Sequence, residues 1–334
     1  MTDRERGDAP RQDPASGYAT PRPVPPGAGE PQAAPRDPAQ HPAVQRDPAR
    51  FRPRLAWRGG VGTTFHVVFL AATLVGLVFL VILLVDIWSD GAAHLSGDFL
   101  RNGPSRFAAR SGVWPALLGS IWVLLLTAVV AFPLGVGTAI WLEEYAPNNR
   151  LTGIIETNIA NLAGVPSIVY GILGLTVFVR ALALGRSVLA GAFTLALLIL
   201  PVIIIASQEA LKAVPGSMRL GSYALGATRW ETIRHHVLPH AMPGILTGTI
   251  LALSRAVGEA APLLLVGAVG FVQFAPRGLD DVFTVIPIQI FNWTSKPQAE
   301  FQAIAAAGSI VLLVVLLAMN AVAILLRNRY AKRR

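Results

Sequence analysis

The sequence predicts an all-α integral membrane protein with about six transmembrane helices. Hydrophobic residues make up 53% of the 334 residues, charged residues only 14%, and the mean hydropathy is +0.53. A soluble domain carries about 25% charged residues, so this chain lacks the charge that a water-facing surface needs. The apolar residues also gather in long runs between short polar stretches, which is typical of several spans rather than one large core.

Residues 1–58 differ in composition from the rest of the chain. They contain 12 of the 25 prolines, many Arg, Asp and Ala residues, and almost no aliphatic run. Such a segment cannot bury enough apolar surface to offset its chain entropy, so we predict that it is disordered. Because no apolar stretch follows the first methionine closely, we do not expect a signal peptide. The transmembrane domain is expected at residues 59–334.

Six apolar segments of roughly 20 residues follow, each about long enough to cross 30 Å of hydrocarbon. Only residues 183–187 separate the third segment from the fourth. Gly and Pro inside a span are tolerated where neighbouring helices satisfy the freed backbone groups. The expected spans are Thr64–Trp88, Leu117–Trp141, Val165–Leu182, Val188–Ile205, Gly244–Val266 and Ala303–Leu326.

Basic residues at both ends predict that both termini are cytoplasmic. Four arginines from Arg50 to Arg58 precede the first span, and residues 327–334 hold five basic residues and no acid. Cytoplasmic flanks carry an excess of Lys and Arg, so the number of spans should be even and the long loop Ser207–Pro243 should lie inside. This topology explains the net charge of +9, and nucleic acid is not expected as a partner.

The loop Ser207–Pro243 has the pattern of a docking element. Pro215 and Gly216 should end one helix, and Ser217 is expected to cap the next. Small residues would let another protein approach the backbone closely, and two large apolar residues would anchor it. The alternative is an ordinary amphipathic helix on the membrane surface. The expected contact residues are Ser217, Gly221, Ser222, Ala224, Leu225, Gly226, Ala227 and Trp230.

Two charged residues, Arg255 and Glu259, lie within the otherwise apolar fifth span. Each charge costs about 3 kcal/mol inside a membrane, and a spacing of four residues lets the two pair on one helix face. Pairing rarely makes buried charges net stabilising. We therefore expect Arg255 to face a translocation path and attract an oxyanion, whose oxygens match the guanidinium donors. Glu259 would orient Arg255 or release the anion; the alternative is a structural ion pair that fixes helix packing.

Residues Ala224–Pro239 resemble the cytoplasmic EAA loop of ABC importer permeases. They read LGATRW, then Leu238-Pro239, and Pro243-Gly244 follows. Leu220 and Gly221 stand where that family usually has Glu and Ala, and His236 stands where it has Ile. The resemblance implies the type I, MetI-like architecture, in which this loop forms short coupling helices that sit in a groove of a separate ATPase subunit.

Further segments resemble the phosphate importer permeases, so that the resemblance covers roughly residues 60–330. Residues 161–171 are similar to that family's third-span motif, and Ser254–Leu263 are similar to its fifth-span motif, with Ala260 in place of the usual Thr. The continuation Pro262-Leu263 is typical of the PstA type rather than of its partner, PstC. Asn292–Ser295 and Phe301-Gln302 also resemble the PstA type.

This resemblance implies the permease subunit of an ATP-driven phosphate importer in a bacterial-type cell membrane. It implies a PstC-like second permease, a dimer of ATPase subunits and an extracytoplasmic phosphate-binding protein as partners, besides membrane lipid. The chain has no Walker-type loop, so it is not expected to be an enzyme, and the partner subunit would bind ATP. No cofactor is expected, and the absence of cysteine excludes thiolate metal sites.

Three other functions remain as alternatives. A permease for another oxyanion, such as sulfate or molybdate, would share the same features. An autonomous secondary transporter would explain the spans and Arg255, but not the docking loop with Gly226 and Leu238-Pro239. A membrane-embedded enzyme would need paired acids, metal-ligand spacing or a nucleophile with its base, and the sequence shows no such set.

Overall fold

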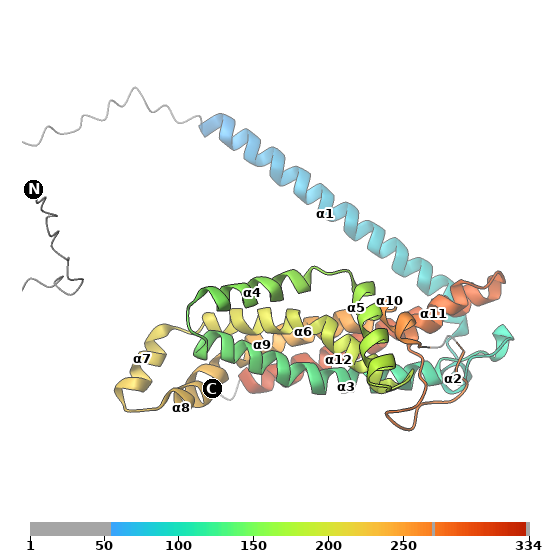
Figure 1. Ribbon diagram of the computed structural model, residues 1–334. Helices are drawn as coiled ribbons and strands as arrows, with labels where there is room; N and C mark the ends of the chain where they lie inside the picture. The colour runs from blue at the N-terminus through green and yellow to red at the C-terminus, as the bar shows by residue number, and fades with distance from the viewer. Residues whose placement is uncertain (1–54, 269–270, 332–334) are drawn as a thin grey trace, which may run out of the picture. The chain divides into compact units, whose positions relative to one another are not determined.

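The computed structural model describes residues 55–268 and 271–331, and every regular element in these ranges is helical (Figure 1). The chain divides into two units, residues 1–70 and 71–334; α1 runs through both, and the other helices belong to the second. Residues 1–54 of the expected N-terminal segment lie outside the described residues, and α1 begins at Leu55, inside the segment 1–58. The helices are α1 (Leu55–Gly91), η2 (Ala92–His94), α2 (Gly97–Arg101), η3 (Ala108–Arg110), α3 (Trp114–Ile140), η4 (Trp141–Tyr145), α4 (Arg150–Ala163), α5 (Ser167–Gly174), η5 (Leu175–Ala181), α6 (Val188–Lys212), α7 (Gly216–Ala224), α8 (Arg229–Thr232), η6 (Ile233–Val237), α9 (Leu238–Val257), α10 (Ala261–Val266), α11 (Ile286–Thr294) and α12 (Ala299–Ala331).

The helix α1 is apolar on all sides and exposed along its described length. Most of its large side chains between Phe65 and Trp88 are more than half exposed. A helix that is hydrophobic all round needs lipid or another apolar surface around it. At its end α1 meets α12, where a Cβ on Gly91 would lie 2.6 Å from the backbone nitrogen of Ala307. Glycine is therefore required for this close approach of the two backbones.

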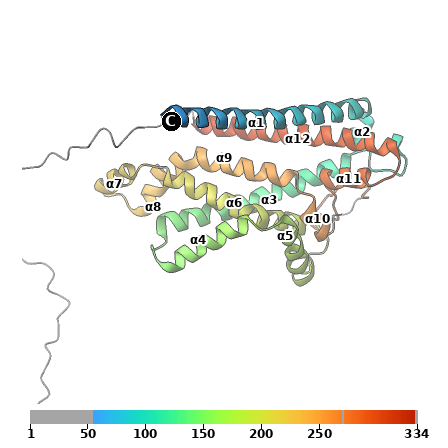
Figure 2. The same cartoon turned by 90° about the horizontal axis from the view of Figure 1, so that it is seen from above.

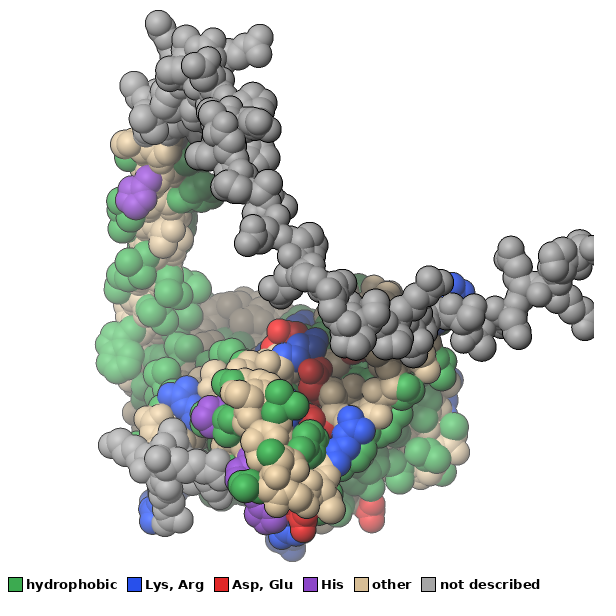
Figure 3. Space-filling model, turned by 90° about the vertical axis from the view of Figure 1, so that its left-hand side faces the viewer, with side chains coloured by type: hydrophobic (Ala, Val, Ile, Leu, Met, Phe, Trp, Pro, Cys, Tyr) green, Lys and Arg blue, Asp and Glu red, His purple; other side chains and the backbone are tan. Residues whose placement is uncertain are grey.

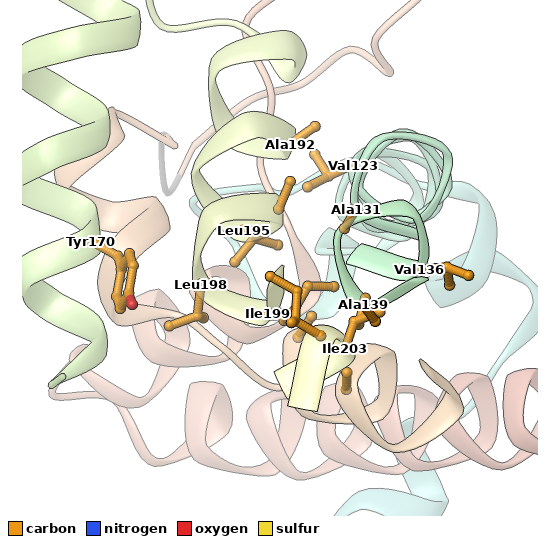
Figure 4. Close-up of a cluster of buried hydrophobic side chains, with 14 of the residues drawn as sticks. Val123, Ala131, Val136, Ala139, Tyr170, Ala192, Leu195, Leu198, Ile199 and Ile203 are labelled. Atoms are coloured by element: carbon orange, nitrogen blue, oxygen red, sulfur yellow. The ribbon is translucent and has the colours of Figure 1, made fainter. Parts of the chain in front are cut away.

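The core of the second unit is formed by α3, α6 and α9, which lie side by side (Figures 1 and 2). A Cβ on Gly135 of α3 would lie 2.6 Å from the side chain of Ile203 of α6, so these helices are in close contact. Small residues let membrane helices approach closely and gain van der Waals contact. This contact is important because the hydrophobic effect does not drive helices together in lipid. Figure 4 shows the buried side chains between them, among them Ala131, Ala139, Leu195 and Ile199.

Within the described ranges, five helices are long and apolar enough to cross a membrane. A sixth span results if the bent pair formed by α4 and the continuous segment α5–η5 counts as one. The predicted first, second, fourth and sixth spans fall on α1, α3, α6 and α12. The expectation of about six spans therefore agrees with the structure, whereas the third predicted span lacks the helix α4 and the fifth is broken.

The third span, predicted from Val165 to Leu182, corresponds to the continuous helical segment α5–η5, but the prediction lacks the bent helix α4 that precedes it. The helix α4 ends at Ala163, α5 begins at Ser167, and the two halves are bent by 102°. Pro166 explains the break, because a residue before proline is driven away from helical backbone angles. The hydroxyl of Tyr170 donates to the carbonyl of Leu162 at 2.8 Å and joins the two sides of the bend.

The fifth span, predicted as continuous from Gly244 to Val266, is wrong, because the structure breaks it. The helix α9 ends at Val257 and α10 begins at Ala261, with Pro262 in its first turn. Proline suits a helix start because its missing N–H would have no partner there. A Cβ on Gly171 of α5 would lie 2.7 Å from the Cα of Pro262, so the helices that follow the two breaks touch.

Candidate functional site

The segment from α7 to α8, residues 216–232, folds as a compact helical hairpin that we name the coupling segment. Gly226 forms the turn with φ +83°, a left-handed conformation that favours glycine. The hydroxyls of Ser222 and Thr232 share a hydrogen bond of 2.8 Å that joins the two helices. A capping box between Thr228 and Glu231 starts α8. The hairpin is therefore held by its own contacts.

The start of α7 differs from the sequence expectation. Ser217 was expected to cap this helix, but Pro215 is the N-cap and Ser217 lies inside the first turn. Pro215 has the non-helical ψ of 134° that an N-cap residue adopts, so the helix begins at Gly216, two residues earlier than a serine cap would place it. Ser217 remains exposed on the first turn.

The coupling segment exposes large apolar side chains. Leu225 is 91% exposed and Leu220 is 71% exposed, and Trp230 is also exposed. Figure 3 views this end of the molecule and shows apolar side chains beside histidine and charged ones. Exposed apolar groups of this size make the segment a candidate surface for another protein or for lipid.

The predicted contact residues divide by exposure. Ser222 is buried and bonded to Thr232, so it joins α7 to α8 and does not face outward. Ala227 is half-buried. A Cβ on Gly221 or Gly226 would meet nothing within 4 Å, so there is open space outside both glycines. The members that face outward are Ser217, Gly221, Ala224, Leu225, Gly226 and Trp230.

The second candidate site lies at the break between α9 and α10. Nε of Arg255 lies 3.5 Å from Oε1 of Glu259, so the predicted pairing is confirmed. The Arg255 side chain is 51% exposed and that of Glu259 only 18%. Glu259 lines a small cavity together with Ser120 and Leu124 of α3. The arginine side chain is therefore half-exposed, while the glutamate is held against the protein.

The structure adds one polar residue, Asn320, near this pair that the sequence analysis missed. The hydroxyl of Ser254 donates to Oδ1 of Asn320 in α12 at 2.6 Å, which ties the last span to the helix turn that holds Arg255. The sequence feature that could have predicted this contact is Asn320 itself, a lone polar residue in the apolar run of α12, since polar side chains inside spans usually bond across helices.

Comparison with known families gives a match over residues 131–333, to the family described as "Binding-protein-dependent transport system inner membrane component". The chain is 35% identical to the probable ABC transporter permease protein YqgI of Bacillus subtilis, over 75% of this chain and 87% of that protein. It is also 35% identical to the phosphate transport system permease protein PstA 1 of Mycobacterium tuberculosis, over 85% of this chain and 94% of that protein.

Two solved structures resemble the fold. A structure of the MetNI methionine ABC transporter in inward-facing conformations matches with a TM-score of 0.51 and 19% identity, over 66% of this chain and 94% of that chain. A bacterial alginate ABC transporter in complex with a periplasmic protein that holds an alginate pentasaccharide matches with a TM-score of 0.57 and 15% identity, over 80% of this chain and 96% of that chain. At these identities the likeness concerns the fold, and it confirms the predicted MetI-like architecture.

Proposed function

Because this chain belongs to the family of inner membrane components of binding-protein-dependent transport systems, we propose that it is the PstA-type permease subunit of an ATP-driven phosphate importer. It is a multi-pass membrane protein and not an enzyme in itself. The family works with a separate ATPase and a substrate-binding protein, so these are partners of the chain. The predicted family resemblance is confirmed.

Phosphate as the substrate is supported by the identity to PstA 1 over nearly the whole length of that protein. The observation that carries the proposal is the half-exposed Arg255 at a helix break, paired with the more buried Glu259. Broken membrane helices leave backbone groups free at mid-span, and transporters use such breaks to hold ions. A guanidinium there supplies planar donors that match two phosphate oxygens at once.

Glu259 has a role that complements Arg255. When phosphate approaches, the carboxylate competes for the guanidinium, so the anion is held without being trapped. A carboxylate cannot attract an anion, but it accepts a hydrogen bond from a protonated phosphate oxygen. Sulfate carries no such proton near neutral pH and would only be repelled. In this mechanism the pair favours phosphate over sulfate through one accepted hydrogen bond.

The coupling segment forms the contact with the ATPase in this proposal. Its exposed Leu225 and Trp230 insert into the ATPase groove, and Gly221 and Gly226 leave room for the approach. A PstC-like permease supplies the other half of the path, two ATPase copies bind the coupling segments, and an extracytoplasmic protein delivers phosphate. Both termini and the coupling segment then lie in the cytoplasm of a bacterial-type cell.

The experiment is uptake of labelled phosphate by the complete importer reconstituted in proteoliposomes with ATP inside. We expect excess unlabelled phosphate to compete and excess sulfate or molybdate to leave uptake within about two-fold. Equal competition by sulfate or molybdate would assign the importer to another oxyanion. Uptake that persists without the ATPase subunits would instead support a secondary transporter.

A further inference from the structure

The helix α3 continues into a π-helical turn, η4, that lies beside the coupling segment. Single π-helical turns are rare and occur often at functional sites. Two adjacent residues of this turn differ in exposure: Glu144 is buried, whereas Tyr145 is exposed. Each of them contacts an arginine of the coupling segment.

The first contact joins Glu144 to Arg219 of α7. Nη2 and Nε of Arg219 donate to Oε1 of Glu144 at 2.7 and 3.2 Å. The same guanidinium donates to the carbonyls of Leu211 and Val214 at 3.0 and 2.8 Å, at the end of α6. A cation is favourable there because helix C-termini carry negative partial charge. One side chain thus binds α7 to both α3 and α6.

The Glu144–Arg219 pair is unlike the other ion pairs. Of the three within the described ranges, the other two join residues three or four positions apart, whereas Glu144 and Arg219 are 75 positions apart in the sequence. Their side chains are only 6% and 20% exposed. If Arg219 served only to cap α6, its bonds to the two carbonyls would suffice and an acid at position 144 would be unnecessary. The pair therefore points to a link between separate elements.

The second contact joins Tyr145 to Arg229, the first residue of α8. The guanidinium carbon of Arg229 lies 5.0 Å from the centre of the Tyr145 ring, within the range of a cation–π interaction. Since Ser222 and Thr232 tie α7 to α8, both helices of the coupling segment reach η4, the turn that continues α3. We name these four residues, Glu144, Tyr145, Arg219 and Arg229, the α3 clasp.

The other part of α3 reaches the second candidate site. Ser120, Val123 and Leu124 of α3 line the cavity beside Glu259. At about 1.5 Å of rise per residue, the stretch from Leu124 to Glu144 is about 30 Å long. The stretch contains Pro133, but α3 packs closely against α6 there, so a displacement of its clasp end is passed along the packed pair of helices.

We propose that the α3 clasp passes movement of the coupling segment to α3, and through α3 to the cavity beside Glu259. Glu144 and Arg219 are the positioning residues of this link, and Tyr145 with Arg229 steadies it. This inference rests on the proposed function, because the movement is that of an ATPase bound to the coupling segment. Without the clasp the ATPase still binds and hydrolyses ATP, but hydrolysis no longer drives uptake.

The test is the ratio of phosphate taken up to ATP hydrolysed by the complete reconstituted importer carrying Glu144→Gln. The matched control is Glu143→Gln, which makes the same chemical change one residue away, where no ion pair is formed in the described structure. We expect Glu144→Gln to keep the ATPase bound, keep hydrolysis within about two-fold and lower the ratio at least ten-fold, with the control near wild type. An unchanged ratio would overturn the proposal, since a merely stabilising pair would alter abundance alone.

A second variant decides the matter if Glu144→Gln fails to assemble. Glu144→Asp keeps the negative charge but shortens the side chain by one methylene. Arg219 then still faces a carboxylate, so the fold is retained, but the distance between the two charged groups increases. We expect a lowered ratio in assembled complexes, and a wild-type ratio would contradict the link. Failure of the proposed function is distinguishable, because the wild-type importer itself would then show no ATP-driven phosphate uptake.

Discussion

Arg219 and Arg255 each pair with a glutamate, but their surroundings differ. The Glu144–Arg219 contact is 2.7 Å long, joins separate helices and is largely buried, with four donor contacts on one guanidinium. The Arg255–Glu259 contact is 3.5 Å long, joins residues four positions apart in the sequence, and leaves the arginine side chain 51% exposed.

The difference shows how one residue type serves two purposes. A guanidinium with four of its five N–H donors bound to the protein is a structural connector, because it has little capacity left for a ligand. A guanidinium with one loose contact keeps donors free for an incoming anion. Substitution of Arg219 should therefore impair assembly, whereas substitution of Arg255 should impair transport of the substrate and leave assembly intact.

Arg219→Ala is expected to have the largest effect on stability. It leaves Glu144 buried without its partner and frees two carbonyls at the end of α6. Breaking a buried pair from one side costs about 3–5 kcal/mol, which is enough to unfold many proteins. Thermal denaturation and membrane abundance of the complex check this, and Arg255→Ala serves as the comparison. Equal losses of thermal stability and abundance from both substitutions would show that the two ion pairs do not differ in their structural role.

Gly226→Trp is expected to disrupt the coupling segment's docking while leaving the Arg255–Glu259 pair intact. Any side chain at φ +83° is strained by about 1–2 kcal/mol, and the indole would also fill the space that the ATPase approaches. Gly226→Ala separates the two effects, because it adds the strain with little bulk. Co-purification of the ATPase should fall severely for Trp and slightly for Ala.

If the Trp and Ala variants both retain the ATPase and its substrate-stimulated hydrolysis at wild-type level, the docking assignment is wrong. If both lose it equally, backbone strain rather than bulk is responsible, and the surface outside Gly226 is not a close contact.

Gly171→Ala should act on the substrate region and spare docking. Its Cβ would lie 2.7 Å from the Cα of Pro262, so the two broken helices must separate, at a cost of about 1–3 kcal/mol. We expect uptake to fall several-fold with the ATPase still bound. Gly137→Ala is the control, because a Cβ there meets nothing within 4 Å. Normal uptake in Gly171→Ala would indicate that the contact between the breaks has no part in transport.

Deletion of Thr2–Arg46 is expected to have the smallest effect. A segment predicted to be disordered contributes no packing, and the arginines from Arg50 to Arg58 remain to hold the orientation of the first span. Uptake and membrane insertion should stay near wild type in cells that express the shortened chain. Complete loss of uptake at normal abundance would show that the segment has a function of its own.

The fold class and the coupling segment were predictable, since apolar length and the LGATRW frame are local properties of the sequence. The helix α4 and the break in the fifth span were missed because average hydropathy over a window does not locate a break in a helix, although Pro166 and Pro262 stand close to the two breaks. The Glu144–Arg219 pair was missed because its partners are 75 positions apart, and only the packing of α3 on α6 brings them together. The Arg255–Glu259 pair was found because its spacing is local.

The central claim is that Arg255 contacts the transported phosphate, and labelled phosphate uptake in two variants tests it most directly. At matched complex abundance, Arg255→Gln and the double variant Arg255→Leu/Glu259→Leu are compared with wild type. Loss of a charge-assisted contact of about 3 kcal/mol corresponds to about 100-fold in uptake. The account predicts assembled complexes and this loss in both variants. If the pair only fixes helix packing, removing both charges restores an apolar helix, and recovery of uptake in the double variant would contradict the claim.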